Sequence, residues 1–423
     1  MSATSATRST LFKSGLRVVN ENIPGIRSAA VGVFVAVGSR DERASLNGAS
    51  HFLEHLLFKG TPERSALEIS SLLDGVGGEF NAYTSREYTC YHARILDEDL
   101  PMAVDVLGDM MTSSLITKAD VEAEREVILD EIAMHDDDPD DLAHNLFAEA
   151  VWSGTSFSRP VAGTAQSISL MSRDQINRYY RGRYRPEAMT VAVAGNVDHA
   201  DVVAMVRKAF ARGGFLKQQA TPNPPRITAK PRKFQINQVH QDRAFEQISV
   251  IIGMQGLTRS DPRRYQLALM SAAMGGGSSA RLFQEVRERR GLAYSVYAFA
   301  SRYSDAGTVG VTAGCLPAKA PELLRVVDEQ LAKVAREGFT EEEIERVKGQ
   351  VRGGTVLGLE DTMSRMTRLG ESWLFQGEVL DIDEILDSVE AVTLAEVNEL
   401  AAELYAQPQS RATIGPANPA PAH

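Results

Sequence analysis

The sequence predicts an α+β fold of two homologous domains, each a largely antiparallel sheet packed with helices on one side. Three observations predict it: a length of 423 residues, short strand patterns mixed with long amphipathic helices, and patterns that recur in the two halves. The length exceeds the usual size of one core and favours two domains of roughly 200 residues. The strands and helices lack the regular alternation of a doubly wound parallel sheet.

Composition narrows the class of protein. Hydrophobic residues make up 43% of the chain and charged residues 24%, which excludes a mostly disordered protein. The net charge of −11 and the lack of a basic block argue against nucleic acid as a partner. Cys90 and Cys315 are the only cysteines, too few for a disulfide framework or an all-cysteine zinc site. No stretch approaches the ~20 apolar residues of a membrane helix, so no membrane partner is expected.

The N-terminal residues leave two localisations open. Residues 1–20 are rich in Ser and Thr and contain no acid, as organelle transit peptides do. A strand pattern already begins within them, which favours a short tail leading into the fold. We therefore expect a cytoplasmic protein, with organelle import not excluded.

Local patterns predict the elements of the first half. Residues 11–19 predict a first strand, and a turn follows at 22–25. Small and β-branched residues predict a buried strand over 29–38, and residues 88–96 predict another after a hairpin signal at 84–87. Amphipathic periodicity predicts helices over 66–73, 117–134 and 173–180.

Prolines mark the boundary between the halves. Residues 221–231 contain four prolines and no apolar periodicity, so they predict an extended linker. The predicted organisation is a domain of residues 1–215, a linker of residues 216–232 and a domain of residues 233–423. Helices are predicted in the second domain over 262–274, 319–336 and 341–359, and a frayed Pro/Ala-rich end over 415–423.

Two patterns recur in the halves. Tyr83 ends the run GEFNAY and Tyr294 ends the run RGLAY, 211 positions later. A capped helix, then Tyr, Pro and a strand, leads to Gly195 in the first half and to Gly415 in the second, an offset of 220. Two matches in the same order at similar offsets indicate a duplicated domain.

The sharpest chemical feature is the run HFLEH at residues 51–55. Its leucine and those that follow lie on one helical face, and Gly-Thr-Pro at 60–62 ends the helix. His51 and His55 are one helical turn apart, so both imidazoles project to one side and can bind one metal ion. Glu54 lies beside them and could take a proton from water. The alternative is two surface histidines beside a salt-bridging glutamate.

A third metal ligand is expected on the helix predicted over 117–134, because catalytic zinc usually has three protein ligands. Glu124 and Glu131 lie three and four positions from apolar residues on one stripe of this helix. Burying an unpaired carboxylate is costly, and a nearby cation is the usual remedy. Salt bridges to arginines are the alternative. The two-histidine helix favours one metal ligand and one supporting carboxylate.

These residues resemble the pitrilysin-like, or inverzincin, zinc peptidases (family M16), whose motif is the inverted H-x-x-E-H. The resemblance covers nearly the whole chain and is nearest to subunits of mitochondrial processing peptidase and their bacterial homologues. It implies one Zn²⁺ per chain and a catalytic N-terminal domain. The implied zinc ligands are His51, His55 and Glu131, with Glu54 as the general base and Glu124 supporting the site.

The resemblance also implies a role for the second half. The Gly-rich residues 275–282, followed by Arg287 and Tyr294, match the family's substrate-positioning segment, whose Arg/Tyr pair holds the substrate and steadies the attacked carbonyl. The residues alone show a Gly-rich turn opening a basic helix, without the Lys-Ser/Thr of a phosphate loop. In the family, domains that bind zinc face domains that carry the Arg/Tyr pair across a closed chamber. We therefore expect a homodimer in which Arg287 and Tyr294 act on the partner's zinc.

Residues 80–84 have the pattern of an exposed strand that leads into a hairpin, although a core strand is the alternative. The family pairs this edge with an extended peptide. The residues concerned are Phe80, Asn81, Ala82, Tyr83 and Thr84. In the mitochondrial enzymes, acidic residues recognise an arginine near the cut. Ser153 and Gly154 stand where such an acid is expected, so presequence-type cleavage and general peptide degradation both remain open.

The expected activity is that of a zinc metalloendopeptidase acting on extended oligopeptides or unfolded segments. The alternative is a non-catalytic scaffold, or core subunit, of the same family, and a hydrolase of another bond is a weaker third. Such scaffolds have lost parts of the metal motif, which is complete here. The acidic run at 135–141 is expected to cap a helix, and Cys90 to be a buried structural residue. Four isolated histidines receive no role: His92, His144, His199 and His240.

Overall fold

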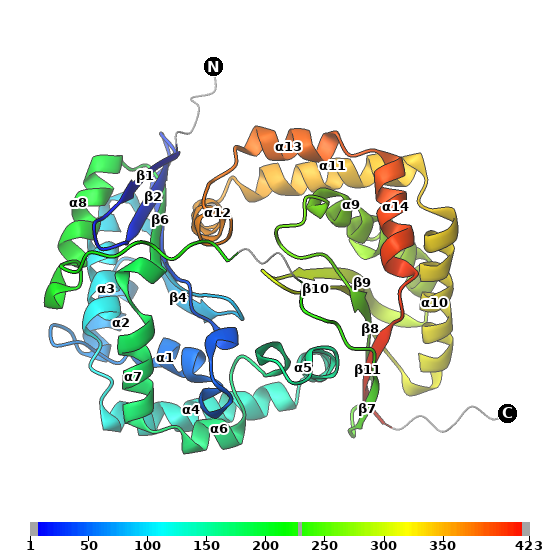
Figure 1. The fold of residues 1–423 in the computed structure, drawn as a ribbon, viewed down its shortest axis with the longest axis horizontal. Coiled ribbons are helices and arrows are strands. Elements are labelled where there is room, and N and C mark those ends of the chain that lie inside the picture. The colour runs from blue at the N-terminus through cyan, green and yellow to red at the C-terminus, as the bar shows by residue number, and fades with distance from the viewer. Residues whose placement is uncertain (1–6, 227–230, 417–423) are drawn as a thin grey trace. The chain divides into compact units, whose positions relative to one another are not determined.

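The computed structural model describes residues 7–226 and 231–416 (Figure 1). The chain forms two compact units, and neither is continuous in sequence. Unit 1 comprises Met1–Ile132, Arg159–Arg226 and Leu357–Val379, and unit 2 comprises Ala133–Ser158, Ile227–Val356 and Leu380–His423. Among the described helices, none has both the length and the apolar character that a membrane span requires.

Unit 1 contains a six-stranded sheet in the order β1-β2-β6-β3-β5-β4. Neighbouring strands are antiparallel except β2 and β6, which are parallel. The strands are β1 (Thr7–Leu11), β2 (Arg17–Asn22), β3 (Ser28–Val35), β4 (Glu79–Thr84), β5 (Thr89–Leu96) and β6 (Met189–Gly195). The helices are α1 (Ala49–Leu57), α2 (Ala66–Gly75), α3 (Leu100–Ser113), α4 (Lys118–Asp136), α6 (Ala165–Leu170), α7 (Arg173–Arg183) and α8 (His199–Ala209).

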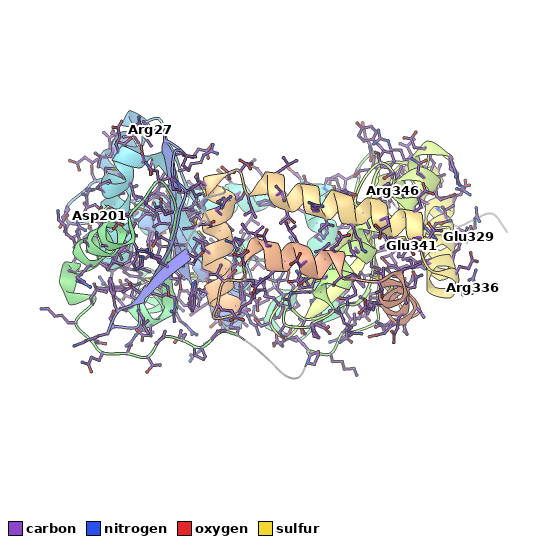
Figure 2. All side chains as sticks on the ribbon, turned by 90° about the horizontal axis from the view of Figure 1, so that it is seen from above. Arg27, Asp201, Glu329, Arg336, Glu341 and Arg346 are labelled. Carbon is purple, nitrogen blue, oxygen red and sulfur yellow. The ribbon has the colours of Figure 1, made fainter. Side chains whose placement is uncertain are left out.

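Unit 2 contains a five-stranded sheet in the order β7-β11-β8-β10-β9. Only β7 and β11 are parallel. The strands are β7 (Gln238–Asp242), β8 (Ile248–Gln255), β9 (Ala293–Arg302), β10 (Gly307–Cys315) and β11 (Ser410–Gly415). The helices are α9 (Arg264–Gly275), α10 (Ala320–Glu337), α11 (Glu341–Gly358), α13 (Ile382–Glu390) and α14 (Leu394–Tyr405), with a short π-helix at Phe283–Glu288. Charged side chains line the exposed faces of α10 and α11, among them Glu329 and Arg346 (Figure 2).

The two sheets repeat one topology. The order β2-β6-β3-β5-β4 in unit 1 corresponds to β7-β11-β8-β10-β9 in unit 2, with the parallel pair at the same place. Gly195 and Gly415 both end the last strand, with φ of 150° and 140°. A Cβ atom on either would lie within 2.7 Å of a neighbouring carbonyl oxygen, so both positions need glycine. The predicted α+β fold of two homologous domains is therefore confirmed.

The other sequence match was coincidental. Tyr83 pairs with Cys90 and lies one step from the hairpin that joins β4 to β5. Tyr294 lies at the start of β9, far from the hairpin that follows Arg302. The two tyrosines therefore do not occupy equivalent places in the repeated sheets.

Each sheet carries on its second face a helix from the other half of the sequence. Helix α12 (Thr362–Phe375) packs on β3 and β6 in unit 1, and α5 (Pro139–Trp152) packs on β11 and β8 in unit 2. Alternate residues of β3 point to opposite faces, so Val33 lies in the main core while Phe34 lies against α12. The predicted layer of helices on one face is present, and this exchanged helix on the other face is additional. The division at a linker of residues 216–232 remains a prediction.

Helix α12 is fixed to its sheet by close packing and buried charge. Gly32 and Gly370 let the helix approach β3, because a Cβ on Gly370 would lie 2.2 Å from the ring of Phe34. The fully buried carboxylate of Glu21 pairs with Arg365 and Arg368 of α12. Two cations on one buried anion compensate the cost of removing that charge from water.

Local prediction failed at the N-terminus. The single strand predicted over 11–19 is a hairpin, because Gly15 adopts φ of 86° and turns the chain between β1 and β2. The N–H of Gly15 donates to the carbonyl of Phe12 at 3.0 Å. The remaining predicted strands and helices lie within about three residues of their expected bounds. Residues 221–226 contain no helix or strand, as predicted, whereas 227–230 and 417–423 lie outside the described residues.

Candidate metal centre

Helix α1 carries the two histidines, and its N-terminus is held by a buried glutamate. The carboxylate of Glu42 accepts the backbone N–H of Gly48 at 2.8 Å and of Ser50 at 2.7 Å. These N–H groups have no partner within the helix, so Glu42 satisfies them. Burial raises the pKa of Glu42 to about 7, although the bonds from Ser50 and Gly48 lower it. The apolar face of α1 is buried in the main core, which turns both histidines toward α4.

Helix α4 brings its carboxylates to the same place. Val121 and Ile128 are fully buried and fix the orientation of the helix against the core. Glu124 lies on the same stripe with a side chain only 8% exposed, and Glu131 is one-third exposed. The predicted stripe therefore faces the interior along its first part, whereas His135 at its end is exposed.

Three side chains converge on one point. Nε2 of His51 lies 3.5 Å from one carboxylate oxygen of Glu131, and Nε2 of His55 lies 3.5 Å from the other. One ligand atom from each residue lies within 4.8 Å of the other two. Tetrahedral zinc at 2.0–2.1 Å from its ligands separates neighbouring donor atoms by about 3.4 Å. Two imidazole nitrogens and a carboxylate with this spacing are a donor set that fits zinc.

A second carboxylate orients one of the histidines. Oε2 of Glu124 lies 3.2 Å from Nδ1 of His55, and Oε1 of Glu124 pairs with Nζ of Lys59 at 2.6 Å. This contact fixes the ring with Nε2 toward Glu131. Nδ1 of His51 is buried and has no hydrogen-bond partner among the described residues.

Charge in the cluster shifts the pKa values of its members. Burial lowers the pKa of His55, but Glu131 and Glu124 outweigh it, so the pKa is raised. The hydrogen bonds from His51 and His55 hold the pKa of Glu131 far below its usual range. Glu131 is therefore an anion that faces two nitrogen donors, as a metal ligand requires.

Glu54 lies beside the histidines and is held by a strand. Its Oε2 accepts a hydrogen bond of 2.5 Å from the hydroxyl of Thr84, at the end of β4. Burial raises the pKa of Glu54 more than this hydrogen bond and the nearby histidines lower it. A carboxylate of raised pKa is a stronger proton acceptor than an ordinary one.

Strand β4 lies at the edge of its sheet and pairs only with β5 among the described strands. Glu79 and Asn81 are exposed, and the remaining residues of the strand are half-buried. The backbone of β4 therefore offers a free edge that begins beside the Thr84–Glu54 contact.

Arg287 and Tyr294 lie together in unit 2. The guanidinium carbon of Arg287 lies 4.5 Å from the ring centre of Tyr294 and 4.7 Å from that of Phe283. Tyr294 is 79% exposed at the start of β9, which is the edge strand of its sheet. The three residues of the metal cluster belong to unit 1, so the predicted site residues divide between the two units.

Four of the other residues considered for chemistry have structural surroundings: Asp138, Cys90, His199 and His240. Asp138 accepts the backbone N–H groups of Asp140 and Asp141 at the start of α5, which confirms the predicted helix cap. Burial raises the pKa of the Cys90 thiol well above its usual value, which disfavours a thiolate nucleophile. His199 and His240 bond to neighbouring side chains, through Thr10 at 2.8 Å and Thr413 at 2.9 Å.

Sequence reasoning missed Glu42, Lys59 and the hydrogen bond of Thr84 to Glu54. Glu42 caps its helix from across a loop, and no repeating pattern in the sequence marks such a residue. Lys59 follows the helix of the histidines by only two residues, yet its partner Glu124 lies 65 positions later. These contacts become visible only when the elements are in place.

Comparison with known proteins identifies relatives along nearly the whole chain. Residues 17–165 match the family model described as insulinase (peptidase family M16), and residues 171–351 match the model of the peptidase M16 inactive domain. A protein of Streptomyces coelicolor named as an uncharacterized zinc protease is 48% identical, covering 97% of this chain and 89% of its own length. A Bacillus subtilis protein of the same description, YmxG, is 38% identical over 97% of this chain and 98% of its own.

Solved structures show the same fold. A protease from Helicobacter pylori superposes with a TM-score of 0.88 at 22% identity, over 97% of this chain and all of the other. A peptidase M16 inactive domain from Pseudomonas fluorescens gives the same TM-score at 17% identity, over 97% and 98% of the two chains. At these identities the likeness concerns the fold alone.

Proposed function

This chain belongs to peptidase family M16, and we propose that it is a zinc metalloendopeptidase acting on extended oligopeptides or unfolded segments. Its relatives carry the name zinc protease, which supports a zinc-dependent peptidase in general. The observation that carries the proposal is the convergence of His51 and His55 on Glu131, with both N···O distances at 3.5 Å. One zinc ion per chain would be held by these three side chains.

Bound zinc would supply Lewis acidity, polarising a carbonyl oxygen and lowering the pKa of water. Glu54 accepts the proton of the attacking water and then donates it to the leaving amine. The hydroxyl of Thr84 keeps the carboxylate of Glu54 in place. Glu124 holds the ring of His55, so that Nε2 remains directed at Glu131.

The free edge of β4 is the proposed binding place for the substrate backbone. A peptide that adds to this edge would continue the sheet through main-chain hydrogen bonds, which are independent of sequence. Residues 80–84 would thus select extended chains over folded ones, and Thr84 would link the bound strand to Glu54. Cleavage specificity would depend on other parts of the molecule.

Arg287 and Tyr294 are proposed to bind the substrate and stabilise the oxyanion. Tyr294 stacks on Arg287 and remains 79% exposed, so the side chain is accessible to a substrate. We further propose a homodimer in which this pair serves the zinc centre of the partner chain. The stretch that contains the pair matches the inactive-domain model and contains no second H-x-x-E-H, so it would contribute binding without metal.

Metal analysis and a peptide-library digest, with and without chelator, test the proposal on wild type and on Glu54→Gln. We expect about one zinc per chain in both proteins. Cleavage should stop with chelator and fall by at least about a hundredfold in Glu54→Gln, because the proton acceptor is lost while the ligands remain. Retained cleavage in Glu54→Gln would refute the role of Glu54.

The same experiment tests the alternative of a non-catalytic scaffold. A scaffold would leave the library uncut in wild type even when fully loaded with zinc. The complete set of His51, Glu54, His55 and Glu131, gathered at one place, favours the enzyme.

A further inference from the structure

Two adjoining cavities in unit 1 are rich in arginine and contain none of the residues of the metal centre. The first has a volume of about 230 Å³ and the second of about 420 Å³. They share five lining residues: Ala36, Glu187, Ala188, Asn223 and Arg226. Their walls come from the start of β2 and β6, the residues directly after β3, the end of α7, the chain around residue 224 and the end of α12. Nothing in the proposed peptide hydrolysis uses them.

Arg17 has no carboxylate partner among the described residues. Its guanidinium carbon lies 3.8 Å from the ring centre of Trp373, so the side chain is held flat on the indole at the wall of the first cavity. Across the described part of the chain it makes no ion pair and no hydrogen bond to a side chain or carbonyl. Burial lowers the pKa of Arg17, as expected for a charge that is partly removed from water and not compensated.

The other charges of the cavities do not supply the missing anion. Glu187 already pairs with Arg185 at 2.6 Å, and Asp41 pairs with Arg226 at 2.8 Å. Within the described ranges Arg183 donates to the backbone carbonyl of Asp41 at 3.2 Å and lies over the ring of Tyr179, but it pairs with no carboxylate. After these pairs are formed, Arg17 at the first cavity and Arg183 at the second have no carboxylate partner among the residues that the structure describes. The chain as a whole carries a net charge of −11, so the local charge at the cavities is opposite in sign to the net charge of the protein.

Apolar groups complete the first cavity. Pro224, Pro225, Met189 and Leu374 line it beside Arg17. A ligand that fills it must therefore combine an anionic group with an apolar body. A planar guanidinium binds carboxylate and phosphate oxygens through paired N–H donors.

We propose that these cavities bind a small organic acid, with its carboxylate or phosphate on Arg17 and Arg183 and its apolar body against Pro224 and Leu374. The acid contacts both the chain around residue 224 and the end of α12, so binding stabilises the attachment of α12 to the sheet of unit 1. This site is independent of zinc. Its occupant is a metabolite-sized acid and not the peptide substrate.

Calorimetric titration of the full chain tests the site with benzoate, phenyl phosphate and the neutral analogue benzyl alcohol. We expect at least one acid to bind at one site per chain, with chelator or without it, and benzyl alcohol to bind at least about tenfold more weakly. The stronger of the two acids identifies whether the site takes a carboxylate or a phosphate. The ligand that binds should also raise the unfolding temperature.

Three variants connect binding to the named arginines. Arg17→Gln should weaken binding of the acid by about tenfold or more, and so should Arg183→Gln, which changes an exposed side chain. Arg207→Gln is the matched control, because Arg207 stacks on Phe12 at 5.3 Å but lines neither cavity. The proposal is overturned if neither acid binds at about 10 mM, or if both arginine variants bind as wild type does. Either result leaves the test of peptide cleavage unaffected.

Discussion

Glu124 is the residue on which the orientation of His55 depends. Its two oxygens contact Nδ1 of His55 and Nζ of Lys59, and its side chain is 8% exposed. We expect Glu124→Ala to weaken zinc binding by about 10- to 100-fold, because a ligating imidazole loses the acceptor that orients it. Competition with a fluorescent chelator measures the affinity.

The matched control for this change is Glu126→Ala. Glu126 lies on the same helix and is exposed. Its removal should leave zinc affinity unchanged. Equal affinities for the two variants would show that Glu124 does not support the centre.

Glu42 makes stability depend on pH. Its pKa rises from 4.5 to about 7 on folding, so the folded protein retains a proton that the unfolded chain releases in this range. The contribution of Glu42 to the free energy of unfolding is therefore largest below pH 4.5. It decreases by about 3 kcal/mol as the pH rises through 7. In Glu42→Gln this contribution is absent.

Urea unfolding between about pH 5 and pH 8 measures this effect. The unfolding free energy of wild type minus that of Glu42→Gln should decrease as the pH rises. A difference that stays constant over this range would mean that Glu42 is already ionised at pH 5.

Much of the candidate metal centre was predictable because the spacing of its residues within each helix is local. His51 and His55 share a helical face whatever the fold, and the carboxylate stripe of α4 follows the same rule. The resemblance to the family then singled out Glu131 as the third ligand. The contacts of Glu42 and Thr84 were not predictable, because each joins elements whose proximity is a property of the whole fold.

At the scale of elements, periodicity predicted most helices and strands but not where they pack. Helices α5 and α12 have an amphipathic face like their neighbours. Such a face predicts that the helix packs on an apolar surface, but it does not specify which of the two sheets provides that surface. The hairpin of β1 and β2 was missed for a different reason. Apolar residues lie on both sides of the turn (Leu11, Phe12 and Leu16), so the segment resembles one strand, although Gly15 adopts a positive φ inside the turn that separates β1 from β2.

The close approach of α12 to β3 depends on Gly370. An ideal Cβ there would lie 2.2 Å from the fully buried ring of Phe34. We expect Gly370→Ala to destabilise unit 1 by about 1–3 kcal/mol through overpacking, and to lower the unfolding temperature by roughly 3–10 °C. Scanning calorimetry measures the change.

Gly353→Ala on α11 is the control, since nothing lies within 4 Å of its Cβ position. That change should be neutral or slightly stabilising, because Ala favours a helix over Gly. Replacing Phe34 by Leu in the Gly370→Ala protein should recover part of the loss. No recovery would indicate that the clash with Phe34 is not the cause.

At the scale of the whole molecule, a homodimer with shared sites can be tested by mixing two inactive proteins. Glu54→Gln keeps Arg287 and Tyr294, and Arg287→Ala keeps the metal centre. If the pair acts on the partner, half of the randomly mixed dimers contain one complete site, and about a quarter of wild-type activity should return.

Two outcomes contradict this arrangement. A mixture that stays inactive after subunit exchange would mean that each chain uses its own Arg287. A sedimentation mass near 46.1 kDa for a fully active preparation would exclude the dimer itself.

The exchange of α5 and α12 has a consequence for a broken chain. A protease that cuts within residues 216–232 removes the only direct covalent link between the halves of the sequence. Yet α12 would remain seated over Phe34 and its neighbours, and α5 over β11 and β8. The two fragments would therefore stay together as a complementing pair, and neither fragment made alone could cover both faces of its own sheet. Duplication followed by such an exchange makes the two domains interdependent, because each sheet is covered on both faces only when both halves of the chain are present.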